Sequence, residues 1–598
     1  MSVSFTDKAG ESTIVIVGGV AGGASCAARM RRLNEGAKII MFERGPDISF
    51  AGCGLSYYIS GEIAERRRLL IQTPERFHRR FQVDVRTHSE VVSINRTAKL
   101  VEAVNRQTGE RYQQHYDKLV LSPGAAPLRP PLPGIEGERV FFLRNIEDAD
   151  RIKTFVEEKD PKTAAVVGGG FIGLEMTECL HNLGLDVILI EMASQVMLQV
   201  DKELAQFIHQ HLKLKGVDLL LDSPVQDFRE TPDGRLFVSV EGGSGVACDF
   251  AVCAIGVKPE TTLARQAGLE LGGRGGIRVN EHLQTSDPDI YAIGDVIETE
   301  NPVTGGARLV PLAGLANKQG RIAADHIAGK RVTFTGSLAT NIVRVFDLTV
   351  ASVGANEKTL RQNGIPYEKS YTHPASHAGY YPGAAPMVLK IFFSPDSGRV
   401  LGAQIVGVDG VDKRIDVLAT AIHAGMSVYD LTELELAYAP QFGSAKDAVN
   451  IAGYVASNVV EGDIKLFHAD ELETLRGKGA FLLDVRTTGE FERGHIDGAV
   501  NIPIDEIRDR CGEIPKDKLL LAYCLTGIRS YFVCRTLTQN GFRVRNMSGG
   551  YVIYCAANPL KCTEIPGLRR WTRLLALETF CSTPEERRIL QRNENPTQ

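Results

Sequence analysis

The sequence predicts an α/β protein made of two doubly wound units, an α+β unit and a smaller C-terminal α/β unit. The two doubly wound units follow from a pattern that occurs twice, at residues 13–33 and 163–183: an apolar strand, a glycine-rich turn and a helix. Residues 340–455 alternate strands with two helical stretches, and a last strand–helix pattern begins near residue 480. At about 150 residues per domain, a chain of 598 residues has room for these four units.

Each glycine-rich turn has the features of a dinucleotide site. The second turn, Gly168–Gly173, matches the full G-x-G-x-x-G pattern, whereas the first, Gly18–Gly23, has Val20 at the middle position. In both, the helix that follows offers free backbone N–H groups and a favourable dipole to a pyrophosphate. The alternative is a tight strand–helix turn without a ligand, and it is a stronger competitor at the first turn than at the second.

The strand after each turn ends in an acidic residue, Glu43 in the first unit and Glu191 in the second. A carboxylate at this position accepts hydrogen bonds from free ribose hydroxyls and repels the 2′-phosphate of NADP. We therefore expect NADH at the second turn. Two dinucleotide sites in one chain imply that a hydride passes between a flavin and a nicotinamide.

Three further segments resemble the flavoprotein disulfide reductases, which carry two Rossmann-like dinucleotide-binding domains. Gly294-Asp295 resembles their flavin-ribityl-binding pair, and Ser122-Pro123-Gly124 and Gly256 resemble their two chain crossings between domains. The resemblance covers residues 13 to about 455 and implies bound FAD and NADH. The residues that it assigns to cofactor binding are Gly18, Val20, Ala21, Gly22, Gly23, Glu43, Val91, Ser122, Gly124, Asp295, Ala313, Gly168, Gly170, Phe171, Ile172, Gly173, Glu191 and Gly256.

Cys53 stands alone in SFAGCGLSYYISGEI, where glutathione-reductase-like members carry two cysteines. A single cysteine closes no internal disulfide, so Cys53 must cycle through a mixed disulfide, a persulfide or a sulfenic acid. The segment resembles the S-F-x-x-C-x-L-x-Y-Y pattern of the coenzyme A disulfide reductase and persulfide reductase branch. We expect a cationic pocket and the nearby flavin to favour the Cys53 thiolate.

By the same resemblance, tyrosines of the partner subunit replace the His–Glu acid/base pair of other branches, which implies a homodimer. Tyr438 is assigned as the proton donor and thiol-orienting group, with Tyr380 as its companion. A phenol titrates near pH 10, so it donates a proton or a hydrogen bond at neutral pH. Tyrosines that merely pack at an interface remain the alternative for both positions.

An NADH oxidase or peroxidase is the first alternative activity, because those enzymes also work through one cysteine. They place a histidine in the first glycine-rich turn to handle peroxide, whereas this chain has Ala21 in that neighbourhood. The absence of that base from the turn argues against peroxide chemistry.

Coenzyme A would need cations for its 3′,5′-ADP end. By resemblance the candidates are Arg29, Arg32 and Arg80, since guanidinium groups bind phosphate through paired donors. Ser49 and Asn317 complete the expected substrate site. Arginines that simply face solvent on a helix are an equally good explanation. The sequence therefore leaves open which thiol compound carries the sulfur of the substrate.

Residues 465 to about 555 resemble a rhodanese domain, with the D-V-R…E…G-H-I-x-G-A pattern in LLDVRTTGEFERGHIDGAVNIP. The loop Cys524–Ser530 is expected to wrap successive N–H groups around the cysteine sulfur, a nest that stabilises a thiolate and then a persulfide anion. Arg529 would add positive charge or brace this loop. The presence of Cys524 argues against an inactive module.

Composition narrows the partners and the compartment. The net charge is −5 without a basic block, which argues against nucleic acid and anionic membrane surfaces. No apolar stretch approaches the roughly 20 residues that span a bilayer, and the polar start predicts no signal peptide. The eleven cysteines show neither C-x-x-C pairs nor metal-ligand spacing, which is typical of free thiols in a cytoplasmic protein.

The sequence therefore predicts a homodimeric FAD enzyme that uses NADH to reduce persulfides, polysulfide or coenzyme A disulfide at Cys53, with coenzyme A bound or as substrate. Cys524 would take up or deliver sulfane sulfur. The same residues leave room for a mainly thiosulfate-type sulfurtransferase, or for a binding or scaffold protein. The expected domains are FAD-binding 1–160 and 277–340, NADH-binding 161–276, dimerisation 341–458, rhodanese 465–560, and a tail of unassigned role, 561–598.

Overall fold

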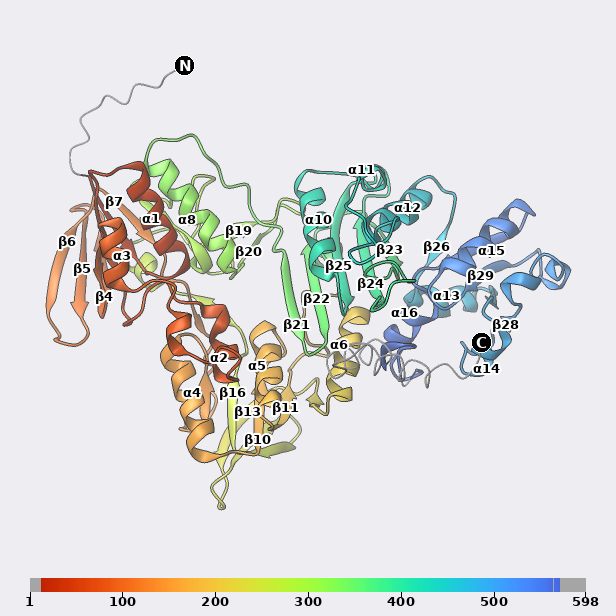
Figure 1. Ribbon diagram of the computed structural model, residues 1–598, viewed down its shortest axis with the longest axis horizontal. Coiled ribbons are helices and arrows are strands. Elements are labelled where there is room, and N and C mark those ends of the chain that lie inside the picture. Colours follow the sequence, from red (N-terminus) through yellow and green to blue (C-terminus); the bar gives the residue numbers. More distant parts are fainter. Residues whose placement is uncertain (1–11, 563, 570–598) are drawn as a thin grey trace. The chain divides into compact units, whose positions relative to one another are not determined.

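The computed structural model describes residues 12–562 and 564–569 (Figure 1). The chain divides into a first unit, Met1–Ile190 with Pro224–Ala339, and a second unit, Glu191–Ser223 with Thr340–Gln598. Most of the expected tail, with Cys581, lies outside the described residues. The predicted mixed α/β fold is confirmed.

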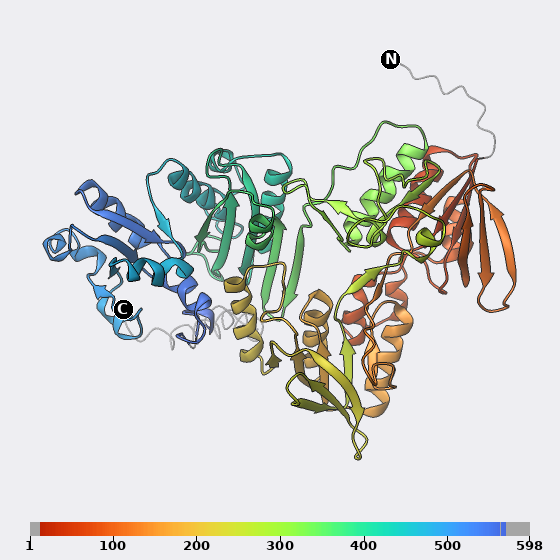
Figure 2. The same ribbon diagram turned by 180° about the vertical axis from the view of Figure 1, so that it is seen from behind.

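The first glycine-rich turn belongs to a parallel sheet of the first unit. Its strands lie in the order β18 (Ile290–Ala292), β7 (Lys118–Leu121), β1 (Thr13–Val17), β2 (Lys38–Phe42) and β3 (Asp84–Arg86). β1 and β2 read as continuous apolar runs because both faces of such a sheet are covered. Helices α1 (Ala21–Leu33) and α8 (Ala313–Ile327) pack together in both views (Figures 1 and 2). A Cβ atom at Gly320 would lie 2.4 Å from the Gly22 carbonyl oxygen, so glycine permits this close approach.

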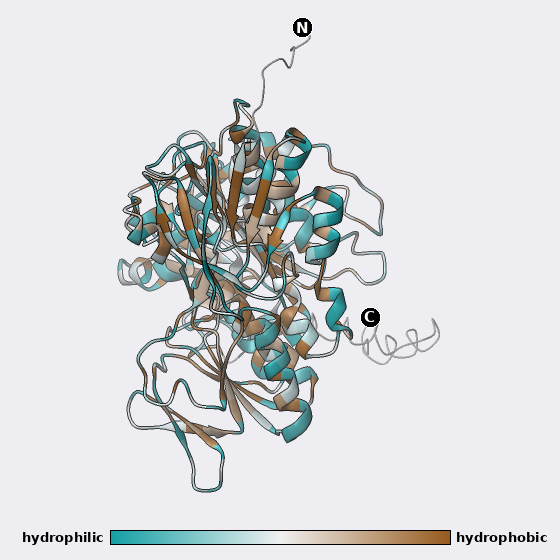
Figure 3. Cartoon of the chain, turned by 90° about the vertical axis from the view of Figure 1, so that its left-hand side faces the viewer, coloured by the Kyte–Doolittle hydropathy of each residue, from teal (hydrophilic) through white to brown (hydrophobic). Residues whose placement is uncertain are grey.

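The second glycine-rich turn belongs to another parallel sheet of the first unit. Its strands lie in the order β11 (Asp186–Ile190), β10 (Thr163–Val167), β16 (Phe250–Cys253) and β9 (Val140–Phe142). The helices of this part are α4 (Ile146–Lys159), which begins with a capping box at Asn145, and α5 (Phe171–Asn182). Figure 3 shows hydrophobic residues gathered on strands and hydrophilic residues on the outer faces of helices, the pattern expected of a doubly wound fold.

Smaller elements complete the first unit. The segments expected to cross between domains contain β8 (Ala125–Pro127) and β17 (Val257–Pro259), which pair with each other. The remaining elements are α2 (Leu55–Ile59), α3 (Pro74–Phe81), β4 (Ser89–Asn95), β5 (Leu100–Asn105), β6 (Arg111–His115), β13 (Val225–Glu230), β14 (Leu236–Val240), β15 (Gly245–Cys248), α7 (Thr262–Gln266), β19 (Thr299–Glu300) and β20 (Ala307–Arg308).

The second unit contains an antiparallel sheet in the order β21 (Asn341–Val345), β22 (Leu348–Gly354), β25 (Val400–Gly407), β24 (Met387–Phe393) and β23 (Glu368–Thr372). Every residue of β24 and β25 is buried, so these central strands form the core. The helices of this part are α9 (Glu357–Gln362), α10 (Val411–His423), α11 (Val428–Glu433) and α12 (Ala448–Val460). This is the α+β arrangement that the sequence predicts.

A parallel sheet ends the described chain, in the order β26 (Leu466–Phe467), β30 (Arg543–Met547), β29 (Leu519–Tyr523), β27 (Phe481–Asp484) and β28 (Val500–Asn501). Its helices are α13 (Leu472–Gly477), α14 (Thr488–Glu492), α15 (Ile528–Gln539) and α16 (Gly550–Ala557). The expected linker near residue 460 is the short segment between α12 and β26.

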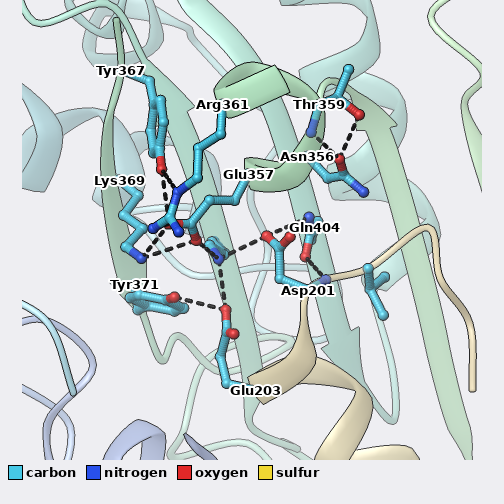
Figure 4. A network of polar contacts seen from close by, with 12 residues as sticks. Asp201, Glu203, Asn356, Glu357, Thr359, Arg361, Tyr367, Lys369, Tyr371 and Gln404 are labelled. Carbon is cyan, nitrogen blue, oxygen red and sulfur yellow. Dashed lines mark hydrogen bonds and ion pairs between the residues drawn. The ribbon is translucent and has the colours of Figure 1, made fainter. Parts of the chain in front are cut away.

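A buried charge cluster ties helix α6 (Lys202–Leu214) to the antiparallel sheet of the second unit (Figure 4). The fully buried Lys390 ammonium on β24 lies 2.7 Å from Asp201, 2.6 Å from Glu203 and 3.3 Å from Glu357. Tyr371 donates a hydrogen bond of 2.7 Å to Glu203. Residues 191–223, which we expected in the NADH-binding domain, therefore group with this sheet by contacts.

Candidate active site

The first glycine-rich turn is tight, and the pyrophosphate of a dinucleotide can come close to its backbone. Gly18 has φ +99°, and a Cβ atom there would lie 2.1 Å from the Ser122 carbonyl oxygen. A Cβ atom at Gly23 would lie 1.9 Å from the Gly18 carbonyl oxygen. Val20 caps α1 and Ala21 begins it, so the free N–H groups of the helix start at this turn. The Glu43 carboxylate accepts hydrogen bonds from the Gly19 and Gly45 N–H groups, at 2.9 and 3.0 Å.

Gly294 and Asp295 follow Ile293, which lies next to this turn. A Cβ atom at Gly22 would meet the Ser122 hydroxyl at 2.9 Å and Ile293 at 3.2 Å. Desolvation raises the pKa of Asp295 to about 6. Gln319 accepts a hydrogen bond from the Gly294 N–H at 2.7 Å, and its amide nitrogen has no hydrogen-bond partner in the described part of the chain.

A close-approach turn, an orphaned buried amide donor and a desolvated carboxylate fit a flavin dinucleotide with a hydroxyl-bearing ribityl chain. Gly18–Gly23, Glu43 and Asp295 are the residues placed to hold it. Of the other expected FAD-side residues, Val91 is buried on β4, Gly124 has φ +74° after β7, and Ala313 begins α8.

The second turn has the same construction. Gly168 has φ +108°, and its Cβ atom would lie 2.5 Å from the Ala254 carbonyl oxygen, two residues before Gly256 (φ +112°). Gly170 caps α5 with open space around its Cα, and Phe171 and Ile172 begin the helix. A Cβ atom at Gly173 would lie 1.8 Å from the Gly168 carbonyl oxygen. Glu191 directly follows β11, and its carboxylate accepts a hydrogen bond from the Ala193 N–H at 2.8 Å.

Cys53 lies in a short 3₁₀ turn, Gly52–Gly54, directly before α2, and the residue is exposed. The prediction of a cationic pocket around Cys53 is wrong. The neighbouring charges that shift the pKa of Cys53 are the carboxylates of Glu175 and Asp295. Partial shielding of the thiol from water, then Glu175 and Asp295, raise the pKa of Cys53 above its usual value. The described protein groups therefore favour the thiol over the thiolate.

Glu175 was not among the predicted site residues. It lies on α5 beside α2, within 3.4 Å of the Ser56 hydroxyl and 3.5 Å of the Tyr57 hydroxyl. Desolvation raises the pKa of this carboxyl group above its ordinary value. The sequence did place Glu175 near a functional segment, because it follows Gly173 in the helix of the second glycine-rich turn. No local pattern, however, relates that helix to Cys53.

Replacing Glu175 by glutamine is expected to lower the apparent pKa of Cys53, because a negative charge that disfavours the thiolate is removed. The pH dependence of Cys53 alkylation by iodoacetamide, followed by peptide mass spectrometry in the flavin-loaded protein, measures this shift toward lower pH. Glu158→Gln, an exposed carboxylate on α4, is the control. An unchanged Cys53 profile in Glu175→Gln would contradict the assignment.

Tyr380 and Tyr438 meet in the second unit. Their hydroxyl groups are 2.8 Å apart, and this hydrogen bond raises the pKa of Tyr380. Their side chains remain 76% and 48% exposed, and the neighbouring aromatic Phe442 is 72% exposed. Two hydrogen-bonded phenols beside an exposed aromatic group are suited to a surface that another subunit covers.

The expected substrate residues lie in two environments. Arg29 forms an ion pair of 2.6 Å with Asp325 on α8, so its guanidinium is already engaged within the first unit. Arg32 on α1 and Arg80 on α3 are exposed. Ser49 has φ +46°, and Asn317 accepts a hydrogen bond from the Ser25 hydroxyl at 2.7 Å. Of the three predicted cations, Arg32 and Arg80 are therefore more accessible to a phosphate than Arg29.

The loop after β29 surrounds the Cys524 sulfur. The Gly527 N–H donates to the sulfur at 3.1 Å, and the Ser530 hydroxyl lies 3.5 Å from it. Gly527, with φ +99°, caps α15, so the helix dipole points at the thiol. Arg529 makes two hydrogen bonds of 2.7 Å to Glu490 and also interacts with Cys524. Arg529 therefore supplies positive charge and braces the loop together.

The segment 546–551 forms hydrogen bonds that support this loop. The Tyr551 N–H donates to the Cys524 carbonyl oxygen at 2.8 Å, and the Asn546 amide donates to the Gly527 carbonyl oxygen at 3.1 Å. Gly550 has φ +60°, and its Cβ atom would lie 2.6 Å from the Cys524 carbonyl oxygen and 2.8 Å from the Gly527 nitrogen. Glycine at this position therefore sets the shape of the sulfur-binding loop.

Gly550→Ala is expected to abolish most sulfur transfer from thiosulfate to cyanide, since the new Cβ atom displaces the Cys524 loop. Gly541→Ala is the matched control: Gly541 also has positive φ, +81°, but its Cβ atom would meet nothing within 4 Å. Both variants carry the backbone strain of about 1 kcal/mol, so a difference between them isolates the clash. Equal activities in the two variants would contradict this role.

Within the described ranges, no group of three or more His, Cys, Asp or Glu residues is placed to hold a metal ion. No described helix is both long and apolar enough to cross a membrane.

Comparison with known proteins identifies three domains in the chain. The family model for pyridine nucleotide-disulphide oxidoreductases matches residues 12–320, the dimerisation domain model of that family matches residues 340–449, and the rhodanese-like domain model matches residues 468–557. A coenzyme A disulfide reductase of Staphylococcus haemolyticus is 37% identical over 447 residues, which cover 75% of this chain and 99% of the relative.

Two solved structures extend the similarity across the C-terminal domain. Reduced CoADR-RHD of Bacillus anthracis is 49% identical with a TM-score of 0.91, covering 93% of this chain and 100% of that chain. An NAD-dependent persulfide reductase from A. fulgidus is 38% identical with a TM-score of 0.85, covering 91% and 100%. The chain therefore belongs to the pyridine nucleotide-disulphide oxidoreductase family, as a member with a dimerisation domain and a C-terminal rhodanese-like domain.

Proposed function

We propose that this protein is an NADH-dependent FAD enzyme that reduces persulfides or coenzyme A disulfide at Cys53, and that Cys524 handles sulfane sulfur for it. The observation that carries the proposal is one exposed thiol, Cys53, beside Asp295 and Glu175 in a unit with two dinucleotide turns. The names of the relatives, coenzyme A disulfide reductase and NAD-dependent persulfide reductase, support the same substrates. A cytoplasmic location suits a protein that depends on reduced thiols.

The reaction balances with one nucleophile. The Cys53 thiolate attacks the sulfane sulfur of a persulfide RS–SH, so the substrate S–S bond breaks, RSH leaves and Cys53 becomes a persulfide. FAD held by Gly18–Gly23, Glu43 and Asp295 would pass on the two electrons of NADH that return Cys53 to the thiol. The sum is RS–SH plus NADH and a proton, giving RSH, hydrogen sulfide and NAD⁺. With coenzyme A disulfide, Cys53 forms a mixed disulfide and both products are coenzyme A thiols.

The proton donor is assigned to the tyrosine pair. In a homodimer, Tyr438 of one subunit would serve Cys53 of the other, with Tyr380 holding its hydroxyl at 2.8 Å. A phenol ordinarily titrates near pH 10, so it is protonated at neutral pH and can protonate a departing thiolate.

Tyr438→Phe is expected to lower kcat by about 10²–10⁴-fold, the usual contribution of a positioned proton donor. Tyr429→Phe is a control, because Tyr429 is a similarly exposed tyrosine on α11 of the same domain. Flavin reduction by NADH, measured by stopped-flow absorbance, should keep its rate in both variants. A Tyr438→Phe enzyme with unchanged kcat would remove the tyrosine from the mechanism.

The thiol carrier of the substrate is assigned to coenzyme A through Arg32 and Arg80. Their guanidinium groups are exposed and can bind phosphate oxygens through paired donors. Inorganic polysulfide has no phosphate and needs no such cations. Comparing it with a coenzyme A substrate therefore tests whether the coenzyme A part contributes to binding.

The test of the function is NADH consumption without oxygen, with coenzyme A persulfide, coenzyme A disulfide and inorganic polysulfide as separate substrates. Turnover on the persulfide or the disulfide supports the proposal. No anaerobic turnover, followed by rapid NADH loss when oxygen or peroxide is admitted, would make the protein an oxidase or peroxidase. Loss of all activity on Cys524→Ser alone would make it mainly a sulfurtransferase.

A further inference from the structure

Two cysteines of the C-terminal domain have no part in the chemistry described above. Cys555 lies on α16, and Cys562 follows this helix. The Asn558 N–H bonds to the Tyr554 carbonyl oxygen at 3.0 Å, and the Cys562 N–H bonds to the Asn558 carbonyl oxygen at 3.0 Å. This turn folds the chain back, and Cys562 packs against the apolar cluster that contains Cys555.

Cys562 and Tyr551 both pack against the cluster that contains Cys555, and the two thiols interact with each other and with Tyr551. Cys555 is buried, whereas Cys562 is half-buried. Their contact lowers the pKa of Cys562 and raises the pKa of Cys555. Because Cys562 is half-buried and Cys555 is buried, Cys562 is the accessible nucleophile and Cys555 is the thiol behind it.

We propose that Cys555 and Cys562 form a second sulfur-reactive site, which accepts sulfane sulfur from a low-molecular-weight persulfide or inorganic polysulfide and closes to a disulfide. Cys562 attacks the sulfane sulfur of RS–SH, RSH leaves, and Cys562 becomes a persulfide. The Cys555 sulfur then attacks the inner sulfur of that persulfide. Hydrogen sulfide leaves with the proton of Cys555, and the Cys555–Cys562 bond forms. In sum, RS–SH and two thiols give RSH, hydrogen sulfide and one disulfide.

The local geometry permits this closure. Cys562 lies outside any helix or strand, so its sulfur can approach Cys555 without unwinding α16. The site also adjoins the Cys524 loop. Tyr551 interacts with both thiols, and its N–H donates a hydrogen bond to the Cys524 carbonyl oxygen at 2.8 Å. The pair therefore lies close to the Cys524 loop in the same domain.

The experiment uses the full-length protein and inorganic polysulfide without oxygen or NADH, so its outcome does not depend on the reductase reaction. After alkylation with iodoacetamide, trypsin cuts at Lys561 and separates peptide 546–561, with Cys555, from peptide 562–569, with Cys562. Non-reducing mass spectrometry is expected to find these two peptides joined. Cys555→Ser should instead leave Cys562 with one extra sulfur atom.

Cys511→Ser, which removes another half-buried thiol of the same domain, is the matched control and should keep the joined peptides. Separate alkylated peptides from a sample in which Cys524 carries a persulfide would overturn the proposal, because the reagent would then have worked. A bond that joins Cys524 to Cys562, or Cys524 to the nearby Cys534, in place of Cys555–Cys562 would overturn it as well.

Discussion

Cys53→Ser is expected to abolish NADH-dependent reduction of persulfide and coenzyme A disulfide, by a factor of about 10⁴ or more. The reaction passes through a covalent sulfur adduct of this residue, and a serine hydroxyl forms none under these conditions. Reduction of the flavin by NADH should persist, because the dinucleotide turns at Gly18 and Gly168 do not involve the Cys53 sulfur. Stopped-flow flavin absorbance and steady-state NADH consumption, both anaerobic, separate these two steps.

Cys511→Ser is the control for this prediction, since it removes a half-buried thiol that belongs to neither the Cys53 segment nor the Cys524 loop. Sulfur transfer from thiosulfate to cyanide should also survive in Cys53→Ser, because that reaction needs the Cys524 loop. Persulfide turnover at the wild-type rate in Cys53→Ser would show that another thiol receives the substrate.

Lys390→Met is expected to destabilise the second unit by about 3–5 kcal/mol, the usual cost of removing one partner from a buried ion pair. Lys390 is fully buried, and its ammonium neutralises Asp201, Glu203 and Glu357. Without it, three carboxylates share an interior site in which Lys369 and Arg361 pair with Glu357 alone of the three. Hydrogen exchange of α6 and β24 measures the loss locally, which matters because a chain of several domains does not unfold in one step.

The pH dependence gives this prediction a second readout. In the wild type, the neighbouring cations lower the pKa of Glu357 to about 2 despite its burial. This carboxylate therefore contributes stability that is present above its unfolded pKa of about 4.3 and is lost as the pH falls toward 2. In Lys390→Met the unpaired carboxylates favour protonation, so the deficit should be largest at neutral pH and should shrink toward pH 4.

Lys358→Met, an exposed lysine next to Glu357 on α9, is the control and should leave the stability of the second unit unchanged. A Lys390→Met protein with wild-type exchange rates in α6, or with a deficit independent of pH, would show that the cluster does not hold this helix.

Much of the architecture could be predicted because it depends on local patterns. The apolar runs of β1 and β10, each ending in a glycine-rich turn, specify a strand and a helix start within about 20 residues of chain. The Cys524 loop was equally visible, since a cysteine between a buried strand and a helix N-terminus has few alternative geometries. These predictions needed no knowledge of which distant segments meet.

The environment of each thiol could not be predicted in this way. A cationic pocket around Cys53 was expected, but Glu175 and Asp295, from α5 and from the turn after β18, lie near it instead. Arg29, expected to meet a phosphate, is paired with Asp325, which is 296 residues away in the sequence. Both outcomes depend on helix packing that no local pattern encodes.

The sequence by itself determined the two dinucleotide turns, the single cysteine Cys53 and the Cys524 loop, because glycine and cysteine act there through backbone geometry and their own chemistry. Only the tertiary structure decided which charges surround Cys53, how Lys390 holds α6, and that Cys562 packs against the cluster that contains Cys555. Electrostatic energies and thiol pairing depend on distances in space, and those distances arise from contacts between residues far apart in the chain.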